Sequence, residues 1–293
     1  MMMKRESMSG LSLIELLVAM TIALVAILAA VQLYSSTRQT YRVQAIQNRL
    51  SEDGRFAISM LQRVITQAGF RPTPTAWTGT GFPTGQTTPV TASSATSMIV
   101  HFYPDDADGS GAGTTANQIG CNGAPVASNT PRVALRISGD SDALTCGLLK
   151  DDGTLNGTAV PWIAPATSGA GASTELVDFL LEYGSDTKSQ DSLGNVIAGT
   201  VAEFGCGLDV AGAGGALRVG DCVADDYTLA KAQATPLDIV AVRACLVLRS
   251  EATDSSIDKM AAWKDCSGAN IAGSQDDRRL YRTFRTTVLL RNH

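Results

Sequence analysis

The sequence predicts an α+β protein in which one long N-terminal helix packs on an antiparallel β-sheet globular domain with long, disulfide-tied loops. Three observations predict this fold class. A helical pattern runs from residue 11 to residue 68, strand-like apolar segments follow from residue 97, and six cysteines all lie beyond residue 120. The 293 residues provide for one large domain or two small ones, with a sizeable core because 44% are apolar.

The first element is an apolar segment long enough to cross a membrane. It runs from Leu11 to Val31, 21 residues interrupted only by Ser12, Glu15 and Thr21. At a rise of about 1.5 Å per residue it spans a hydrocarbon core of roughly 30 Å. We therefore expect a helix at 11–33 that crosses the membrane or fills the core of an assembly.

The residues before this segment indicate its orientation and type. Lys4 and Arg5 precede it, so the positive-inside rule predicts a cytoplasmic N-terminus and an external body. A secretory signal peptide would place its small residue after a shorter apolar run, whereas Gly10 precedes a long one. An ordinary signal anchor does not account for Glu15, because a carboxylate at membrane depth is unfavourable without a partner.

The helical pattern then continues as an amphipathic stretch over residues 34–69. Its apolar residues recur at steps of three, four or seven: Val43, Ile46, Leu50, Ala57, Leu61, Ile65 and Ala68. Gly69 and Pro72 predict the end of the helix, and Gly54 is expected to weaken or bend it. Such a helix suits burial among partners in its first half and packing on its own globular domain in its second.

Residues 70–293 are predicted to form a β-rich globular domain. Loops are expected at 73–96, 105–130, 150–172, 184–200 and 205–226, where apolar periodicity is lost. In the last predicted strand Phe284, Val288 and Leu290 can share one face. Six strands are predicted, at 97–103, 132–137, 144–149, 175–183, 238–249 and 280–290.

The cysteines favour disulfides in an oxidising compartment. Their number is even and no C-x-x-C pair occurs, so the spacings of zinc ribbons and thioredoxins are absent. Six cysteines allow 15 pairings. Among these we expect the sequence neighbours to pair: Cys121 with Cys146, Cys206 with Cys222, and Cys245 with Cys266.

The sequence offers little for catalysis, cofactor binding or nucleic-acid binding. The histidines are His101, in a strand pattern, and His293 at the end of the chain, so His101 is interpreted as structural. The net charge of −5 disfavours a broad nucleic-acid surface. The segment from Asp106 to Gly111 has the first half of a calcium-loop pattern but places Asn117 where a Glu is needed, so no metal site is predicted. We expect no enzyme activity and no cofactor.

The segment from Gly10 to Glu15 resembles the leader of type IV prepilins. The resemblance implies that a prepilin peptidase removes residues 1–10 by cutting between Gly10 and Leu11 and N-methylates Leu11. The family usually has Phe at that position. Glu15 becomes the fifth mature residue, where the family keeps a glutamate for assembly. A buried pair between Glu15 and the Leu11 amine of a neighbouring subunit would mainly specify register.

Other segments are similar to the PilW branch of minor pilins. They are 38–42, 53–57 and 68–71 in the helical region, and 176–184, 242–250 and 281–292 in the strand region. The resemblance implies a type IV pilin-like fold and a minor pilin that helps initiate or cap a type IV pilus. A pseudopilin of a type II secretion system and an adhesive or DNA-uptake pilus subunit are the alternatives.

The resemblance also implies partners and a location. The partners are other minor and major pilins, bound through the N-terminal helix, the prepilin peptidase and the inner-membrane assembly platform, with a tip adhesin as a further candidate. The subunit would be a single-pass inner-membrane protein with a periplasmic body before assembly. After assembly it would be part of an extracellular pilus.

Overall fold

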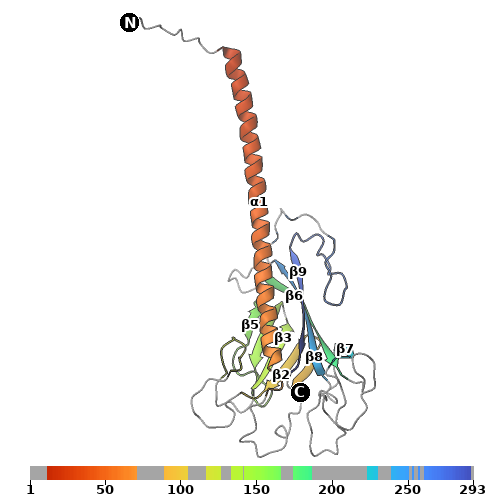
Figure 1. The fold of residues 1–293 in the computed structure, drawn as a ribbon. Helices are drawn as coiled ribbons and strands as arrows, with labels where there is room; N and C mark the ends of the chain where they lie inside the picture. The colour runs from red at the N-terminus through yellow and green to blue at the C-terminus, as the bar shows by residue number, and fades with distance from the viewer. Residues whose placement is uncertain are drawn as a thin grey trace, which may run out of the picture. The chain divides into compact units, whose positions relative to one another are not determined.

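A computed structural model describes the chain at residues 12–70, 89–104, 117–126, 133–140, 142–165, 174–186, 223–229, 239–250, 253, 257 and 261–291. The chain divides into two compact units, residues 1–47 and 48–293. Helix α1 (Leu13–Thr66) begins in the first unit and ends in the second (Figure 1).

In the first unit α1 is exposed on all sides from Leu13 to Arg42. Its large apolar side chains between Leu13 and Leu33 are 51–78% exposed. This exposure agrees with a sequence that is apolar all around the helix rather than along one stripe. The segment therefore buries no apolar surface within its own unit.

In the second unit the last turns of α1 form the centre of the core. One face is buried, as the predicted amphipathic pattern requires, and it consists of Leu50, Gly54, Ala57, Met60, Leu61, Val64 and Ile65. The helix ends at Thr66, and Gly69 adopts the left-handed backbone (φ 72°) typical of a helix C-terminus. The Gly69 amide then donates to the carbonyl oxygen of His101 at 2.8 Å, which joins the chain to the first sheet.

The first sheet has five antiparallel strands in sequence order. They are β1 (Val90–Ser94), β2 (Ser97–Phe102), β3 (Val133–Asp140), β4 (Ala143–Leu148) and β5 (Val160–Ile163). In β2 the buried residues alternate with half-buried ones, the pattern of a strand with one face on the core. Each strand pairs with its neighbour in the chain, and a long connection joins β2 to β3.

The second sheet has four antiparallel strands in the order β7-β6-β8-β9. They are β6 (Thr174–Ser185), β7 (Asp226–Thr228), β8 (Ile239–Ser250) and β9 (Tyr281–Leu289). The longest strands, β6 and β8, pair at the centre over almost their full lengths. One face of this sheet belongs to the core and includes Phe179, Leu181, Val242, Leu246 and Val288.

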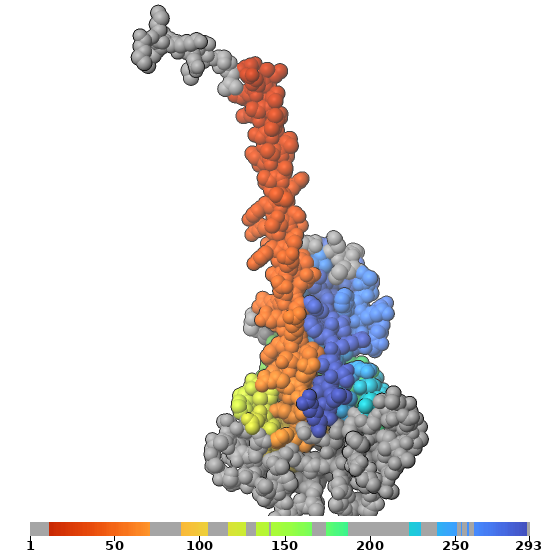
Figure 2. All heavy atoms as spheres, viewed as in Figure 1, coloured from red at the N-terminus to blue at the C-terminus, as the bar shows by residue number. Residues whose placement is uncertain are grey.

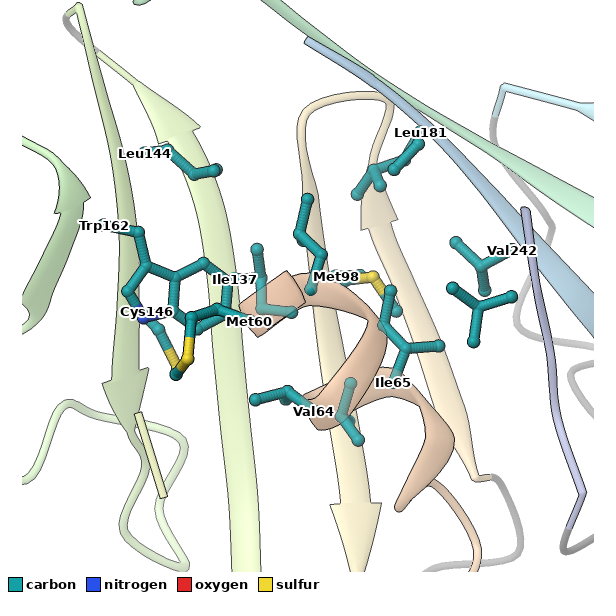
Figure 3. Packing of buried hydrophobic residues seen from close by; sticks show 14 of the residues in the cluster. Met60, Val64, Ile65, Met98, Ile137, Leu144, Cys146, Trp162, Leu181 and Val242 are labelled. Atoms are coloured by element: carbon teal, nitrogen blue, oxygen red, sulfur yellow. The ribbon is translucent and has the colours of Figure 1, made fainter. Parts of the chain in front are cut away.

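The two sheets and α1 share one hydrophobic core. Figure 3 shows Val64 and Ile65 of α1 between side chains of the first sheet, such as Ile137, and side chains of the second, such as Val242. The sheets also contact each other directly, because the Leu181 amide donates to the Ala95 carbonyl oxygen at 2.7 Å. Removing α1 from this core would therefore leave both sheets without their common partner.

The predicted α+β class is confirmed, and all six predicted strands are present with ends shifted by three residues or fewer. Three strands were not predicted: β1 and β5 lie inside predicted loops, and β7 begins at the last residue of one. The division into two sheets was also not predicted. Small polar residues dominate β1, Pro161 interrupts the pattern of β5, and the three residues of β7 are too few for a period. The predicted loops 105–130, 184–200 and 205–226 lie largely outside the described residues.

Gly54, which was expected to weaken or bend the helix, lies within α1, and the helix continues through it to Thr66. The side chain of Phe284, from β9, lies directly against this glycine. A Cβ atom at position 54 would be 2.2 Å from Phe284 Cε2, far inside van der Waals contact. Figure 2 shows the orange stretch of α1 against the blue C-terminal strand. Gly54 is thus a notch in the helix that admits an aromatic ring.

We predict that Gly54→Ala destabilises the body by about 1–3 kcal/mol, because the added methyl group must displace a packed ring. Urea denaturation of the detergent-solubilised chain measures the loss. Ser59→Ala, on the exposed face of the same helix, is the matched control and should be nearly neutral. The cost of Gly54→Ala should also shrink in a Phe284→Ala background. Equal costs in both backgrounds would show that the ring is not the cause.

Candidate functional site

The exposed apolar half of α1 is the first candidate site. Among the described residues, α1 is long enough and apolar enough to span a membrane. Its exposed apolar surface is unfavourable in water at about 25 cal/mol per Å². Large continuous apolar surfaces of this kind mark contact with lipid or with other proteins. This segment therefore needs a bilayer or a bundle of apolar helices around it.

Polar side chains within and just after this half bond to their own backbone. The Thr21 hydroxyl donates to the Val18 carbonyl oxygen at 2.8 Å, and the Thr37 hydroxyl donates to the Leu33 carbonyl oxygen at 2.8 Å. The same arrangement recurs at Ser35 and Thr40. Hydroxyl groups satisfied within the helix do not need water, which suits an apolar environment.

Glu15 lies in the first turn of α1 and caps that end. Its Oε2 accepts a hydrogen bond from the Ser12 amide at 3.0 Å. Amide groups at a helix N-terminus have no partner in the helix and carry partial positive charge, so a carboxylate is favourable there. Glu15 is thus positioned by its own helix end. The expected cleavage residues Gly10 and Leu11 lie outside the described residues.

The outer face of the second sheet, opposite the core, is the second candidate site. Its side chains form rows across the strands, and one row contains Glu175, Arg249 and Tyr281. Glu175 is 6% exposed, and its Oε2 accepts hydrogen bonds from Arg249 Nε at 2.6 Å and Arg279 Nη1 at 2.7 Å. The hydrogen bond from Arg249 holds the pKa of Glu175 below its ordinary value of 4.5, although burial opposes this shift.

A second ion pair on this face is more open to solvent. Arg243 Nη1 lies 3.2 Å from Glu182 Oε2, and the side chains are 42% and 32% exposed. The Arg243 guanidinium also lies over the ring of Tyr227, 3.8 Å from its centroid. Arg243 and Glu182 line a hollow of about 410 Å³ together with Arg285 and the Cys245–Cys266 disulfide. The carboxylate that lines this hollow, Glu182, is already paired with Arg243. The residues lining the hollow therefore contain no acid–base pair placed for proton transfer.

Residues 261–280, between β8 and β9, fold back over the same outer face. The disulfide Cys245–Cys266 joins this segment to β8, and the Cys266 amide donates to Asp178 Oδ2 at 2.7 Å. Trp263 stacks on Tyr281 with ring centroids 6.2 Å apart, and its Nε1 donates to Thr283 Oγ1 at 3.1 Å. Covalent, polar and aromatic contacts together hold this segment on the sheet.

The cysteines and His101 are placed as follows. Cys121–Cys146 in the first sheet region and Cys245–Cys266 in the second are disulfides between sequence neighbours, and Cys206 and Cys222 lie outside the described residues. His101 is in β2 with its Nε2 3.2 Å from Thr91 Oγ1, which agrees with a structural role. The described residues contain no group of three or more His, Cys, Asp or Glu side chains able to hold a metal, and the Asp106–Asp108 loop is not among them.

The part of the chain that contains the second sheet matches a known protein family. Residues 173–292 match the family model of the type IV pilus-assembly protein W, PilW. The predicted resemblance to the PilW family is confirmed over this part of the chain. A type IV-like pilin from Thermus thermophilus is also similar, at 13% identity and a TM-score of 0.43, over 83% of this chain and 96% of that one. Among curated proteins none matches the chain.

The matched region contains the whole second sheet and the β8–β9 segment, and therefore the Glu175 cluster. This cluster was not predicted from the sequence. A signal for it exists in the strands, where Glu175, Glu182, Arg243 and Arg249 interrupt otherwise apolar segments on the same face of the sheet. In the matched region charged side chains thus pair across strands, an arrangement that stabilises a sheet.

We predict that Glu175→Gln destabilises the body by about 1–3 kcal/mol at pH 7, because it leaves two half-buried guanidinium groups without a counterion. Glu182→Gln, in the more exposed pair, is the control and should cost less than about 1 kcal/mol. Denaturation at several pH values adds a second test. Since the pKa of Glu175 is lowered in the folded protein, its contribution is complete above pH 4.5 and is lost as the pH falls through the folded-state pKa. A Glu175→Gln cost that persists unchanged at low pH would contradict the ion-pair explanation.

Proposed function

We propose that this chain is a minor pilin that helps to initiate or cap a type IV pilus, with its N-terminal helix packed among those of other pilins. The PilW match over residues 173–292 is the observation that carries the proposal, and it supports a type IV pilus-assembly subunit. The exposed apolar half of α1 adds the part that such a subunit needs for insertion and packing.

The proposal gives α1 two successive environments. Before assembly Leu13–Leu33 lies in the inner membrane, and after assembly the same side chains contact neighbouring helices in the fibre. Both environments remove its apolar side chains from water, so transfer between them keeps the hydrophobic stabilisation. Because lipid tails and apolar helices differ little in polarity, the hydrophobic effect does not favour the fibre over the membrane. Close packing and polar contacts between helices must therefore do so.

Glu15 supplies such a polar contact. Cleavage between Gly10 and Leu11 creates an amine one residue before Ser12, whose amide already bonds to Glu15. In the membrane this local hydrogen bond partly satisfies the carboxylate. In the fibre the carboxylate pairs with the Leu11 amine of a neighbouring subunit, and a misaligned neighbour leaves both charges buried without partners. This penalty selects one register between adjacent helices.

Disulfides support a periplasmic body more clearly than basic residues do. Lys4 and Arg5 precede the apolar segment, but Arg38, Arg42 and Arg49 follow it. The count of basic residues therefore does not by itself fix the orientation. Cys121–Cys146 and Cys245–Cys266 require an oxidising compartment, which favours a cytoplasmic N-terminus and an external body.

The role is structural rather than catalytic. On the second sheet the carboxylates of Glu175 and Glu182 form ion pairs with arginines. His101 belongs to the other sheet. The protein partners are the prepilin peptidase, the assembly platform and other pilins, and the binding surface for pilins is the N-terminal helix.

We predict that co-expression with a prepilin peptidase yields a chain beginning at N-methylated Leu11, and that the chain stays uncut without the peptidase. Intact mass and terminal sequencing of the membrane fraction measure this directly. Gly10→Val, which removes the small residue at the cut, should remain unprocessed. A terminus after Ala29 or Ala30 would instead identify a secreted protein and refute the pilin assignment.

We also predict that Glu15→Gln is processed and inserted in the membrane normally but is lost from sheared pili by roughly tenfold, since a register-specifying charge pair is gone. Immunoblots of the membrane and pilus fractions compare it with wild type. Glu52→Gln, an exposed carboxylate later in α1, is the control for a change of charge alone. Normal incorporation of Glu15→Gln would remove Glu15 from the assembly mechanism.

A further inference from the structure

A short basic and aromatic stretch of α1 follows the apolar segment directly. Leu13 to Leu33 is 21 residues, which at about 1.5 Å per residue matches a hydrocarbon core of roughly 30 Å. Tyr34 is therefore the first residue at the level of the lipid head groups on the C-terminal side of the span. Tyr34, Arg38 and Arg42 follow one another at four-residue steps and so share one face of the helix.

The aromatic side chains of this stretch are available to lipid. Tyr34 is 63% exposed and Tyr41 is 74% exposed, although both carry large apolar rings. The Arg38 guanidinium lies over the Tyr34 ring, 5.4 Å from its centroid, which orients the charge beside the ring. Tyrosine rings with one apolar and one polar end concentrate at the interface between membrane and water.

The positive charge of this stretch is not balanced by acidic residues nearby in the helix. No Asp or Glu occurs between Leu16 and Ser51, whereas Arg38, Arg42 and Arg49 are all in that interval. Arg38 and Arg42 are ten or more residues away from Glu52, or at least about 15 Å along the axis, which is beyond the reach of an ion pair. Guanidinium groups favour bidentate contacts with phosphate, and their stems can follow apolar surface.

We propose that Arg38 and Arg42, flanked by Tyr34 and Tyr41, bind the phosphate of an anionic phospholipid such as phosphatidylglycerol in the leaflet on the C-terminal side of the span. This inference rests on the proposed membrane anchoring of α1. The bound head group compensates the positive charge that enters the external leaflet with the helix, and it holds Leu13–Leu33 at a defined depth until the subunit leaves the membrane.

The test uses the full chain reconstituted in phosphatidylcholine vesicles that contain a trace of spin-labelled phosphatidylglycerol or spin-labelled phosphatidylcholine. Electron paramagnetic resonance measures the share of each probe that the protein immobilises. Wild type is expected to prefer phosphatidylglycerol by about threefold, and this preference should decline with added salt. Arg38→Gln/Arg42→Gln should lose most of the preference.

A matched double variant, Arg55→Gln/Arg63→Gln, removes the same charge from exposed positions further along α1 and should keep the wild-type preference. Lys4 and Arg5 are unchanged in every variant, so the difference between variants reports the 38–42 stretch alone. Equal preferences in wild type and Arg38→Gln/Arg42→Gln would overturn the proposal. So would lost fibre incorporation of that variant without a change in lipid preference, because the arginines would then contact neighbouring pilins instead.

Extraction with alkaline carbonate separates this inference from the proposed function. A chain that stays in the vesicles but shows no preference for phosphatidylglycerol refutes lipid binding and leaves the membrane anchor intact. A chain that is extracted from the vesicles refutes the anchor, and lipid binding with it. Thermal unfolding of the body in Arg38→Gln/Arg42→Gln should match wild type, since both residues lie outside that unit.

Discussion

Burial of the last turns of α1 between two sheets is the interaction on which the rest of the body depends. Each sheet has its own hydrogen-bonded ladders, but the apolar faces of both belong to one core that includes Leu61, Val64 and Ile65. The Gly54 notch and the Phe284 ring fix the position of the helix along this core. Close packing of this kind distinguishes one arrangement from neighbouring ones, beyond what apolar burial alone provides.

The sequence predicts the elements well where a long periodic pattern exists. α1, β6 and β8 extend over many residues, and their long apolar patterns identify the type of element. In α1 the period of 3.6 also identifies the buried face. It predicts short elements poorly: β1 contains mostly Ser and Thr, and β5 contains a proline at the edge of its sheet. These strands are stabilised by pairing with a neighbouring strand, which no local pattern reveals.

The same limit applies to the candidate sites. Glu15 stands out because a carboxylate in an apolar run is unfavourable without a partner, so the anomaly is visible in the sequence. Glu175 does not stand out, because its partners Arg249 and Arg279 are 74 and 104 residues away. Gly54 is a similar case: intrinsic helix propensity counts against glycine, and the local sequence does not show the close approach of Phe284 from a distant strand.

The notch between Gly54 and Phe284 also limits how far α1 can move along its own axis. To slide along its axis by one turn, about 5.4 Å, α1 would have to carry a bulkier residue past the ring, either Leu50 or Ile58. The ring therefore acts as a catch against axial slip. A tensile load on the helix would then be transferred to the second sheet through β9.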